Sequence, residues 1–432
     1  MNIQIMDWKQ LTSDLRNALL SRPEQALTKE FKDSVTSIIS DVKENGDAAV
    51  KELTRKYDSV VISNLVVSQN EIEKAYLDIS EDLLKAIRLS LKNITAFHAE
   101  SKFDSYEMET MPGVRCGKIV KPISRVGLYI PAGSAPLFST VLMLGAPAKI
   151  AGCREVVLCT PPNSKGEIDS AILVAANEVG ISKIYKVGGA QAISAMAFGT
   201  QSIPKVYKIF GPGNGYVTEA KLQVSTVLNG PSIDMPAGPS EVLVLGDETA
   251  NPIFVASDLL AQAEHGPDSQ VIFVCSSLCT LEKTKMEIEK QLLNLPRKEI
   301  AEKSLESARL ILAEDETQMV EISNLYAPEH LIIQTKEPGE ILKQVENAGS
   351  VFLGSYTPES AGDYASGTNH VLPTYGKAAS ISGVSVASFV KAITYQEISR
   401  KGLQTIGPSI EVMARRESLD AHRNSISIRL NE

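Results

Sequence analysis

Short apolar runs alternate with helical stretches through the middle of the chain. The first series of strand-like runs comprises residues 155–160, 183–188 and 205–210, with helices expected at 139–152, 169–180, 189–199 and 215–224. A second series comprises 241–246, 269–276, 330–335 and 350–355, with helices expected at 252–265, around 280–313 and at 340–349. Strands that alternate with helices in this way form parallel sheets covered on both faces. The pattern therefore predicts two α/β modules in tandem.

The two ends of the chain have a different character. Residues 1 to about 105 are mostly polar with helical periodicity, and an extended segment is expected from about 114 to 130. Residues 354–376 are punctuated by glycine, which predicts a loop. The last fifty or so residues are predicted to be α-rich and to end in a short strand at 426–430. They are too few for a large core of their own, so they are expected to pack on something else.

Composition narrows the class of protein. At 432 residues the chain is long enough for two or more domains. Its net charge of −9, without a basic stripe, argues against a nucleic-acid partner. We expect no membrane association, because no apolar run approaches membrane length, and the N-terminus lacks the basic start and apolar run of a signal peptide. The five cysteines show no motif spacing, so the expected location is the cytoplasm.

A site built on imidazole must draw on only five histidines, His98, His265, His330, His370 and His422. Gln262 and His265 lie at the end of an apolar helix that Gly266 and Pro267 terminate. The partial negative charge at that end suits a cation, so an amide oxygen and an imidazole there are plausible metal ligands. By spacing alone, the same pair also fits an ordinary helix surface.

Acidic residues accompany four of the five histidines at the ends of predicted elements. Glu329 and His330 stand at the entrance of an apolar strand, where two bases could share one cleft. The remaining candidates are Glu359, Asp363 and His370 in the predicted loop, and Glu417 with His422 near the C-terminus. This distribution is what a metal site with acid–base partners requires, but sequence spacing cannot assemble residues so far apart.

Two glycine-containing turns are candidate ligand sites. The run IFGPGNGYVTEA follows a strand and opens a helix, but its third glycine is misplaced for the dinucleotide fingerprint. It fits either a phosphate cradle at a helix start or a tight turn. Ser240 follows a second Pro/Gly turn and lies at the lip of the next strand, where α/β proteins often bind ligands.

Seven stretches together resemble a known family. They are SRVGLYIPAGSAPLFSTVLMLGAPAKIAGC, VGGAQAISAMAFGT, IFGPGNGYVTEAK, SIDMPAGPSEVLV, DLLAQAEHGPDSQ, YAPEHL and AGDYASGTNHVLPT. Nearly unbroken and in family order, they resemble the conserved stretches of histidinol dehydrogenase. That resemblance implies oxidation of L-histidinol to L-histidine through L-histidinal, the last two steps of histidine biosynthesis, with two NAD and one zinc ion per site.

The resemblance also implies roles for individual residues. The expected zinc ligands are Gln262, His265, Asp363 and His422, with His422 supplied by the partner subunit of a homodimer. The expected proton acceptors are Glu329, which would activate water, and His330, the general base. The expected substrate contacts are Ser240, Gln262, His265, His330, Glu359, Asp363, His370, Glu417 and His422. The expected NAD contacts are Tyr129, Gln191 and Asn214.

The fold that follows has two tandem Rossmann-like modules with parallel sheets, a helical N-terminal extension and a small C-terminal crossover segment. The expected domains are 1–25, then 26–128 joined with 237–380, then 129–236, and finally 381–432, which would pack on the partner subunit.

Three other functions compete with this one. A dehydrogenase of the same fold could oxidise another small polyol or amino alcohol, but the acidic Glu359 and Glu417 favour a substrate with an imidazole and an amino group. A zinc hydrolase would have no use for an NAD module. A non-catalytic zinc-binding dimer would not need Glu329 and His330.

Overall fold

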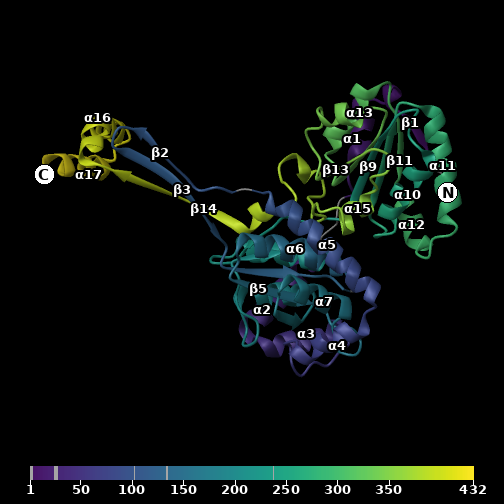
Figure 1. The fold of residues 1–432 in the computed structure, drawn as a ribbon, viewed down its shortest axis with the longest axis horizontal. Coiled ribbons are helices and arrows are strands. Elements are labelled where there is room, and N and C mark those ends of the chain that lie inside the picture. Colours follow the sequence, from purple (N-terminus) through teal and green to yellow (C-terminus); the bar gives the residue numbers. More distant parts are fainter. Residues whose placement is uncertain (1–2, 24–27, 102, 133–134, 237) are drawn as a thin grey trace.

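The computed structural model describes residues 3–23, 28–101, 103–132, 135–236 and 238–432. Two parallel sheets form the body of the molecule, and a narrow antiparallel sheet extends from it as an arm (Figure 1). The predicted fold class, with two parallel-sheet α/β modules, is confirmed. Among the described residues, no helix is both long and apolar enough to cross a membrane.

The first parallel sheet has six strands. In spatial order they are β1 (Ile5–Asp7), β11 (Arg309–Leu312), β10 (Gln270–Cys275), β9 (Glu241–Gly246), β12 (His330–Gln334) and β13 (Ser350–Leu353). One face is covered by α10 (Pro252–Ala263), α11 (Leu278–Leu292) and α12 (Lys298–Leu305). The other is covered by α1 (Ser13–Leu20), α13 (Glu316–Tyr326) and α14 (Pro338–Leu342). Helix α15 (Glu359–Tyr364) follows the last strand.

The second parallel sheet has five strands. In spatial order they are β6 (Lys183–Lys186), β5 (Glu155–Thr160), β4 (Arg125–Tyr129), β7 (Lys208–Phe210) and β8 (Ser232–Ile233). Counted along the chain this order is 3-2-1-4-5, so the strand order reverses between β4 and β7. Such a reversal opens a crevice at the carboxyl ends of the two strands, which is where dinucleotides bind in this class of fold.

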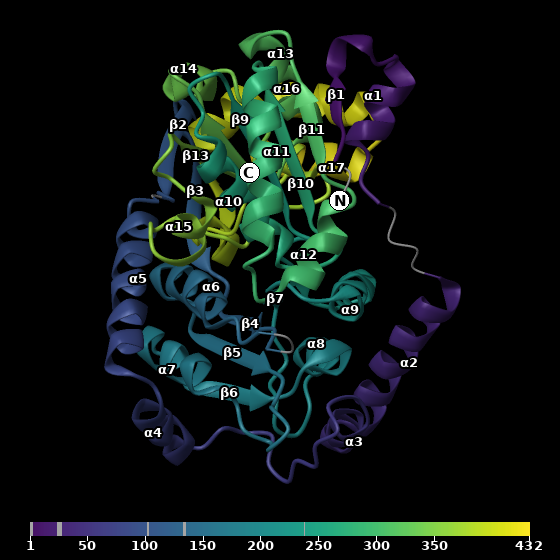
Figure 2. The ribbon, with the colours of Figure 1, turned by 90° about the vertical axis from the view of Figure 1, so that its right-hand side faces the viewer.

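Helices cover both faces of the five-stranded sheet. One layer contains α4 (Gln69–Asp78), α5 (Glu81–Ala99), α6 (Phe138–Ala151) and α7 (Ser170–Val179). The other contains α2 (Lys29–Asn45), α3 (Asp47–Tyr57), α8 (Gly189–Phe198) and α9 (Gly215–Thr226). Figure 2 shows α2 to α5 lying around this sheet.

This packing corrects the domain grouping expected from the sequence. Residues 26–128 were expected to join 237–380, yet the buried apolar faces of α2 to α5 share their cores with the five-stranded sheet. Helical periodicity predicts that a helix buries one face, but it does not say which sheet that face covers. The N-terminal extension also contributes β1, an edge strand paired with β11. The expected borders at 25/26 and 236/237 fall on or beside residues outside the described ranges.

The arm is built from segments far apart in the sequence. Strands β2 (Tyr106–Met111), β3 (Val114–Pro122) and β14 (Val390–Ile398) pair antiparallel, and α16 (Arg400–Arg416) and α17 (Asp420–Asn431) pack at its tip. The strand expected at 426–430 is wrong, because these residues lie inside α17. The alternating ISI pattern suggested a strand. Instead Ile426 and Leu430, four residues apart, both face Gly407 of α16, as residues on one helical face do.

Candidate active site between the two sheets

The predicted acid–base pair lies at the amino edge of the six-stranded sheet. Helix α13 ends at Tyr326, and the left-handed backbone of the next residue, Ala327 (φ 51°), turns the chain back toward the sheet. Glu329 and His330 follow at the start of β12, beside the start of β9. Both side chains are buried. A carboxyl group and an imidazole are thus held side by side in a site with little water.

The hydrogen bonding of His330 determines its tautomer. Nδ1 lies 3.0 Å from the main-chain oxygen of Glu241, which can only accept, so Nδ1 carries the proton. Nε2 is then left with its lone pair and has no hydrogen-bond partner among the described residues. Burial lowers the pKa of His330, which favours this neutral form. The ring is therefore prepared to accept a proton at Nε2, which faces Asp363 Oδ1 at 3.8 Å.

Glu329 is held by the same residue. Its Oε2 accepts a hydrogen bond of 2.8 Å from the main-chain N–H of Glu241. Burial raises its pKa well above the usual range of a carboxyl group, and the hydrogen bond from Glu241 opposes that effect. Oε2 lies 3.6 Å from Nδ1 of His330, so the two candidates share one small volume.

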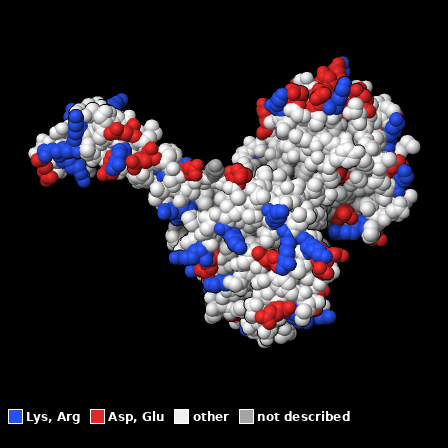
Figure 3. All heavy atoms as spheres, viewed as in Figure 1, with Lys and Arg blue, Asp and Glu red and all other residues white. Residues whose placement is uncertain are grey.

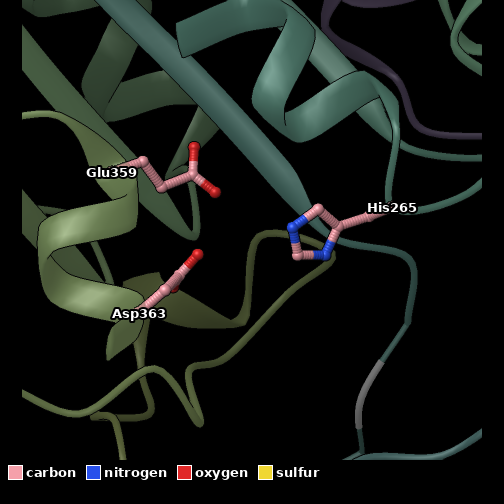
Figure 4. A group of neighbouring side chains, drawn as sticks. All are labelled: His265, Glu359 and Asp363. Atoms are coloured by element: carbon pink, nitrogen blue, oxygen red, sulfur yellow. The ribbon is translucent and has the colours of Figure 1, made fainter. Parts of the chain in front are cut away.

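A group of potential metal ligands lies next to this pair. Figure 4 shows His265, Glu359 and Asp363, whose ligand atoms all lie within 4.8 Å of one another. Glu359 and Asp363 are four residues apart on α15, so both face the same side, and His265 lies in the turn after α10. Glu359 was expected as a substrate contact, and the structure places it inside this group.

Several buried polar atoms here lack a hydrogen-bond partner. Gln262, in the last turn of α10, is fully buried, and neither its amide oxygen nor its amide nitrogen has a partner among the described residues. The same holds for Oε2 of Glu359. Buried polar atoms are normally paired, because an unsatisfied one costs about 1–3 kcal/mol. The donor set of imidazole, carboxylate and amide oxygen therefore fits a bound cation or polar ligand.

His370 is hydrogen-bonded in a way that supports the main chain of Asp363. Its Nδ1 donates to the main-chain oxygen of Asp363 at 2.8 Å, and its Nε2 lies 3.1 Å from Oγ1 of Thr140. Both ring nitrogens are engaged, so the contact between His370 and α15 fixes the backbone that carries Asp363.

The cavity beside this group extends to the five-stranded sheet. It has a volume of about 1060 Å³, and its lining includes Tyr129, Gln191, Asn214, Ser240 and His265. The three residues expected to contact NAD thus line the same cavity as a candidate metal ligand and a candidate substrate contact. Tyr129 is the last residue of β4, Gln191 lies in the first turn of α8 and Asn214 caps the start of α9. Helix N-termini such as these favour anionic groups, for example phosphates.

Packing around this cavity requires the first two glycines of the IFGPGNG run, whereas a Cβ on the third, Gly215, would meet only the Phe31 ring at an ordinary 3.5 Å. Gly211 has φ 121°, and a Cβ there would lie 2.0 Å from the main-chain oxygen of Tyr129. A Cβ on Gly213 would lie 2.4 Å from a methyl group of Val217. The glycines let β7 leave the sheet close to β4 and enter α9 tightly, a requirement that does not depend on the usual fingerprint spacing.

Glu417 and His422 are not brought to the cavity within one chain. Both are exposed on the arm, at the end of α16 and in α17, far from α10 and α15 (Figure 1). Sequence reasoning also missed Arg22, which contacts Glu241 next to the acid–base pair. Arg22 lies in a polar N-terminal segment without any motif, so no sequence signal could have found it.

Comparison with known proteins identifies the family. The family model described as histidinol dehydrogenase matches residues 20–430. The chain belongs to the histidinol dehydrogenase family. Histidinol dehydrogenase of Mannheimia succiniciproducens is 54% identical over 99% of this chain and 99% of its own length. That of Bacteroides thetaiotaomicron is 56% identical over 96% of each chain.

The fold agrees with this family assignment. The crystal structure of histidinol dehydrogenase from Elizabethkingia anophelis matches with a TM-score of 0.95 and 48% identity, over 99% of this chain and 98% of that one. The resemblance found in the seven sequence stretches is therefore confirmed, and with it the class of enzyme, an oxidoreductase of the histidinol dehydrogenase family.

Proposed function

We propose that this protein oxidises L-histidinol to L-histidine through L-histidinal, the last two steps of histidine biosynthesis, with NAD as the hydride acceptor. The observation that carries the proposal is the continuous cavity between the sheets. The five-stranded module contributes Tyr129, Gln191 and Asn214, the positions proposed to bind NAD, and the six-stranded module contributes Ser240 and His265. A dinucleotide and a small polar substrate can meet there in one space.

His330 and Glu329 have separate roles in this proposal. His330, neutral with Nε2 free, takes the hydroxyl proton of the substrate as hydride leaves to NAD. It gives that proton to the carbonyl oxygen as water adds to the aldehyde, so it is neutral again and takes a hydroxyl proton of the hydrate in the second oxidation. Glu329, with its raised pKa and its fixed Oε2, takes a proton from the water that adds to the aldehyde. Burial of both groups excludes bulk water, which keeps the aldehyde in the site between the two steps.

Zinc is the cofactor proposed for the neighbouring group. Gln262, His265, Asp363 and the partner subunit's His422 are the proposed ligands, and the unpaired amide of Gln262 and the clustered His265 and Asp363 support the first three. When bound, zinc would serve as a template that grips nitrogen atoms of the substrate. Ser240, Glu359 and Glu417 are proposed as remaining substrate contacts. His370 is proposed to lie beside the substrate while its ring nitrogens stay bonded to Asp363 and Thr140.

A homodimer is proposed because His422 and Glu417 stand away from the cavity of their own chain. The arm stands clear of the body on the face shown in Figure 3. It exposes large apolar side chains, including Val412 at 66%, Met413 at 65% and Ile428 at 60%. Apolar side chains gathered on a projecting segment favour contact with another surface, and a second copy would place His422 in a neighbouring site. We propose the cytoplasm as the location, as the composition suggested.

The test is NADH formation from L-histidinol and NAD with zinc, repeated after chelation. Two NADH per histidinol, lost with a chelator and restored by zinc, are expected. One NADH with released aldehyde would contradict the second half of the proposal. Turnover of another small polyol or amino alcohol, but not of histidinol, would overturn the substrate assignment and leave the fold and NAD site standing.

The shared site is tested by mixing two variants that are inactive in the complete oxidation to histidine, Glu329→Gln and His422→Ala. Each mixed dimer would contain one intact site, so refolding an equal mixture should restore about a quarter of the wild-type activity. No recovery, with mixed dimers demonstrated, would contradict the contribution of His422 from the partner subunit.

A further inference from the structure

Arg22 is bound into the strand edge that carries the acid–base pair. Its Nε and Nη2 donate to the two carboxylate oxygens of Glu241 at 2.5 and 2.8 Å. The Nη2 atom also donates to the main-chain oxygen of Tyr326 at 2.7 Å. The Arg22 side chain is 12% exposed and that of Glu241 is fully buried. A two-point fork of this kind is shorter, stronger and more directional than a surface ion pair.

Both members of the acid–base pair are hydrogen-bonded to the main chain of Glu241. Its N–H donates to Glu329, and its carbonyl oxygen accepts from His330. Any shift of Glu241 would therefore move two hydrogen bonds at once. The Glu241 carboxylate also accepts from the main-chain N–H of Tyr375 at 2.9 Å, so it is committed to structural contacts rather than to proton transfer.

Arg22 joins the two segments whose spacing sets this arrangement. One segment is the start of β9 at Glu241. The other is the end of α13, where the carbonyls of Tyr326 and Ala327 point to the guanidinium just before the turn into β12. The segment that carries Arg22 is itself anchored, because Nη2 of Arg309 on β11 donates to the main-chain oxygen of Ser21 at 2.9 Å.

We propose that Arg22 is a positioning residue for Glu329 and His330, acting through the carboxylate and backbone of Glu241. This role rests on the proposed function. Arg22 touches neither the cavity lining nor the candidate metal ligands in any contact that the structure records. Its loss should therefore slow the chemical steps without weakening the binding of histidinol or NAD.

The test compares Arg22→Met, which keeps the apolar stem, with Arg22→Lys, which keeps the charge but loses the fork. We expect Arg22→Met to lower kcat for histidinol by about tenfold or more, because small misplacements of catalytic groups are costly. Both KM values should stay within about threefold of the wild type, since substrate contacts are intact. Arg22→Lys should recover melting temperature but not kcat, because one ammonium is a single point donor.

Arg125→Met is the matched control. Arg125 also binds one carboxylate, Glu155 at 2.6 Å, and one main-chain oxygen, Lys205 at 2.8 Å, but on the five-stranded sheet. Its loss should lower the melting temperature and leave kcat unchanged. If kcat falls in step with melting temperature in both Arg125→Met and Arg22→Met, the proposed role is overturned.

A second variant keeps the test decisive if Arg22→Met does not fold. Glu241→Gln retains the main-chain groups and the shape of the side chain but weakens the fork. Glu241→Gln should lower kcat and leave both KM values unchanged. In the double variant with Arg22→Lys, kcat should fall no further than in the more impaired of the two single variants, because both substitutions weaken the same contact. Full kcat in Arg22→Lys and Glu241→Gln would overturn the proposal. A wild-type enzyme without turnover of histidinol would instead overturn the proposed function itself.

Discussion

Replacing Gln262 by methionine should separate stability from metal binding. Gln262 is fully buried in the last turn of α10, and both polar atoms of its amide lack partners among the described residues. Methionine has the same unbranched length, so it fills the same space without an amide. The metal-free protein should therefore become more stable, although a residue of the candidate site has been removed.

The expected size follows from the two unpaired atoms. An unsatisfied buried donor or acceptor destabilises the folded state by about 1–3 kcal/mol. Gln262→Met should therefore raise the free energy of unfolding of the metal-free protein by about 2 kcal/mol. A ligand present at a hundred times its Kd stabilises a protein by about 2.7 kcal/mol. The wild type should show that gain with zinc, whereas the variant, with one proposed ligand missing, should lose most of it.

The assay is thermal unfolding, measured once with EDTA and once with zinc. The cores of the two sheets need not unfold as one unit, so each variant is compared with the wild type under identical conditions. The control is Gln334→Met, also buried, whose Oε1 lacks a partner among the described residues but whose Nε2 donates to Asp258 Oδ2 at 3.0 Å, so its loss leaves that buried carboxyl without this hydrogen bond. That variant should be destabilised in EDTA and should keep its response to zinc. A Gln262→Met protein that is less stable in EDTA, or that zinc stabilises as much as the wild type, would refute the reasoning.

Three further outcomes follow from the structure. Burial raises the pKa of Asp258 to about 7, above its unfolded value. The folded state therefore holds the proton more tightly, and stability falls as pH rises from about 4 to 7. Asp258→Asn should make this fall in melting temperature in EDTA shallower, and the buried Glu329, whose pKa is also raised, accounts for a remaining part. Gly211→Ala would place a Cβ 2.0 Å from the main-chain oxygen of Tyr129, so this variant should have a higher KM for NAD and a lower melting temperature. The control is Gly339→Ala, whose Cβ would have no atom within 4 Å and which should change neither quantity. Glu329→Gln should lower the number of NADH formed per histidinol, because it blocks the second oxidation. The kcat for complete oxidation should fall by roughly 10²–10⁴-fold. The zinc-dependent shift in melting temperature should remain.

The sequence predicted strands best where they are central and apolar. The runs at 155–160, 241–246 and 330–335 are strands β5, β9 and β12, each buried on both sides, so composition alone marks them. Strand β11 was missed because it has only four residues and follows two charged helices. Helix α15 was missed because its six residues lie in a glycine-punctuated stretch. Short elements depend on their neighbours more than on their own periodicity.

The sequence by itself determined the fold class, the family and the set of residue types available for chemistry. These depend on local periodicity and on motifs, which are properties of neighbouring residues. Only the tertiary structure decided that the amino edge of one sheet faces the carboxyl edge of the other, and that His265 meets Glu359 and Asp363. Arg22 reaches Glu241 across 219 positions of sequence. Such contacts arise because packing of whole helices and sheets sets the distances between their ends, and no local pattern records those distances.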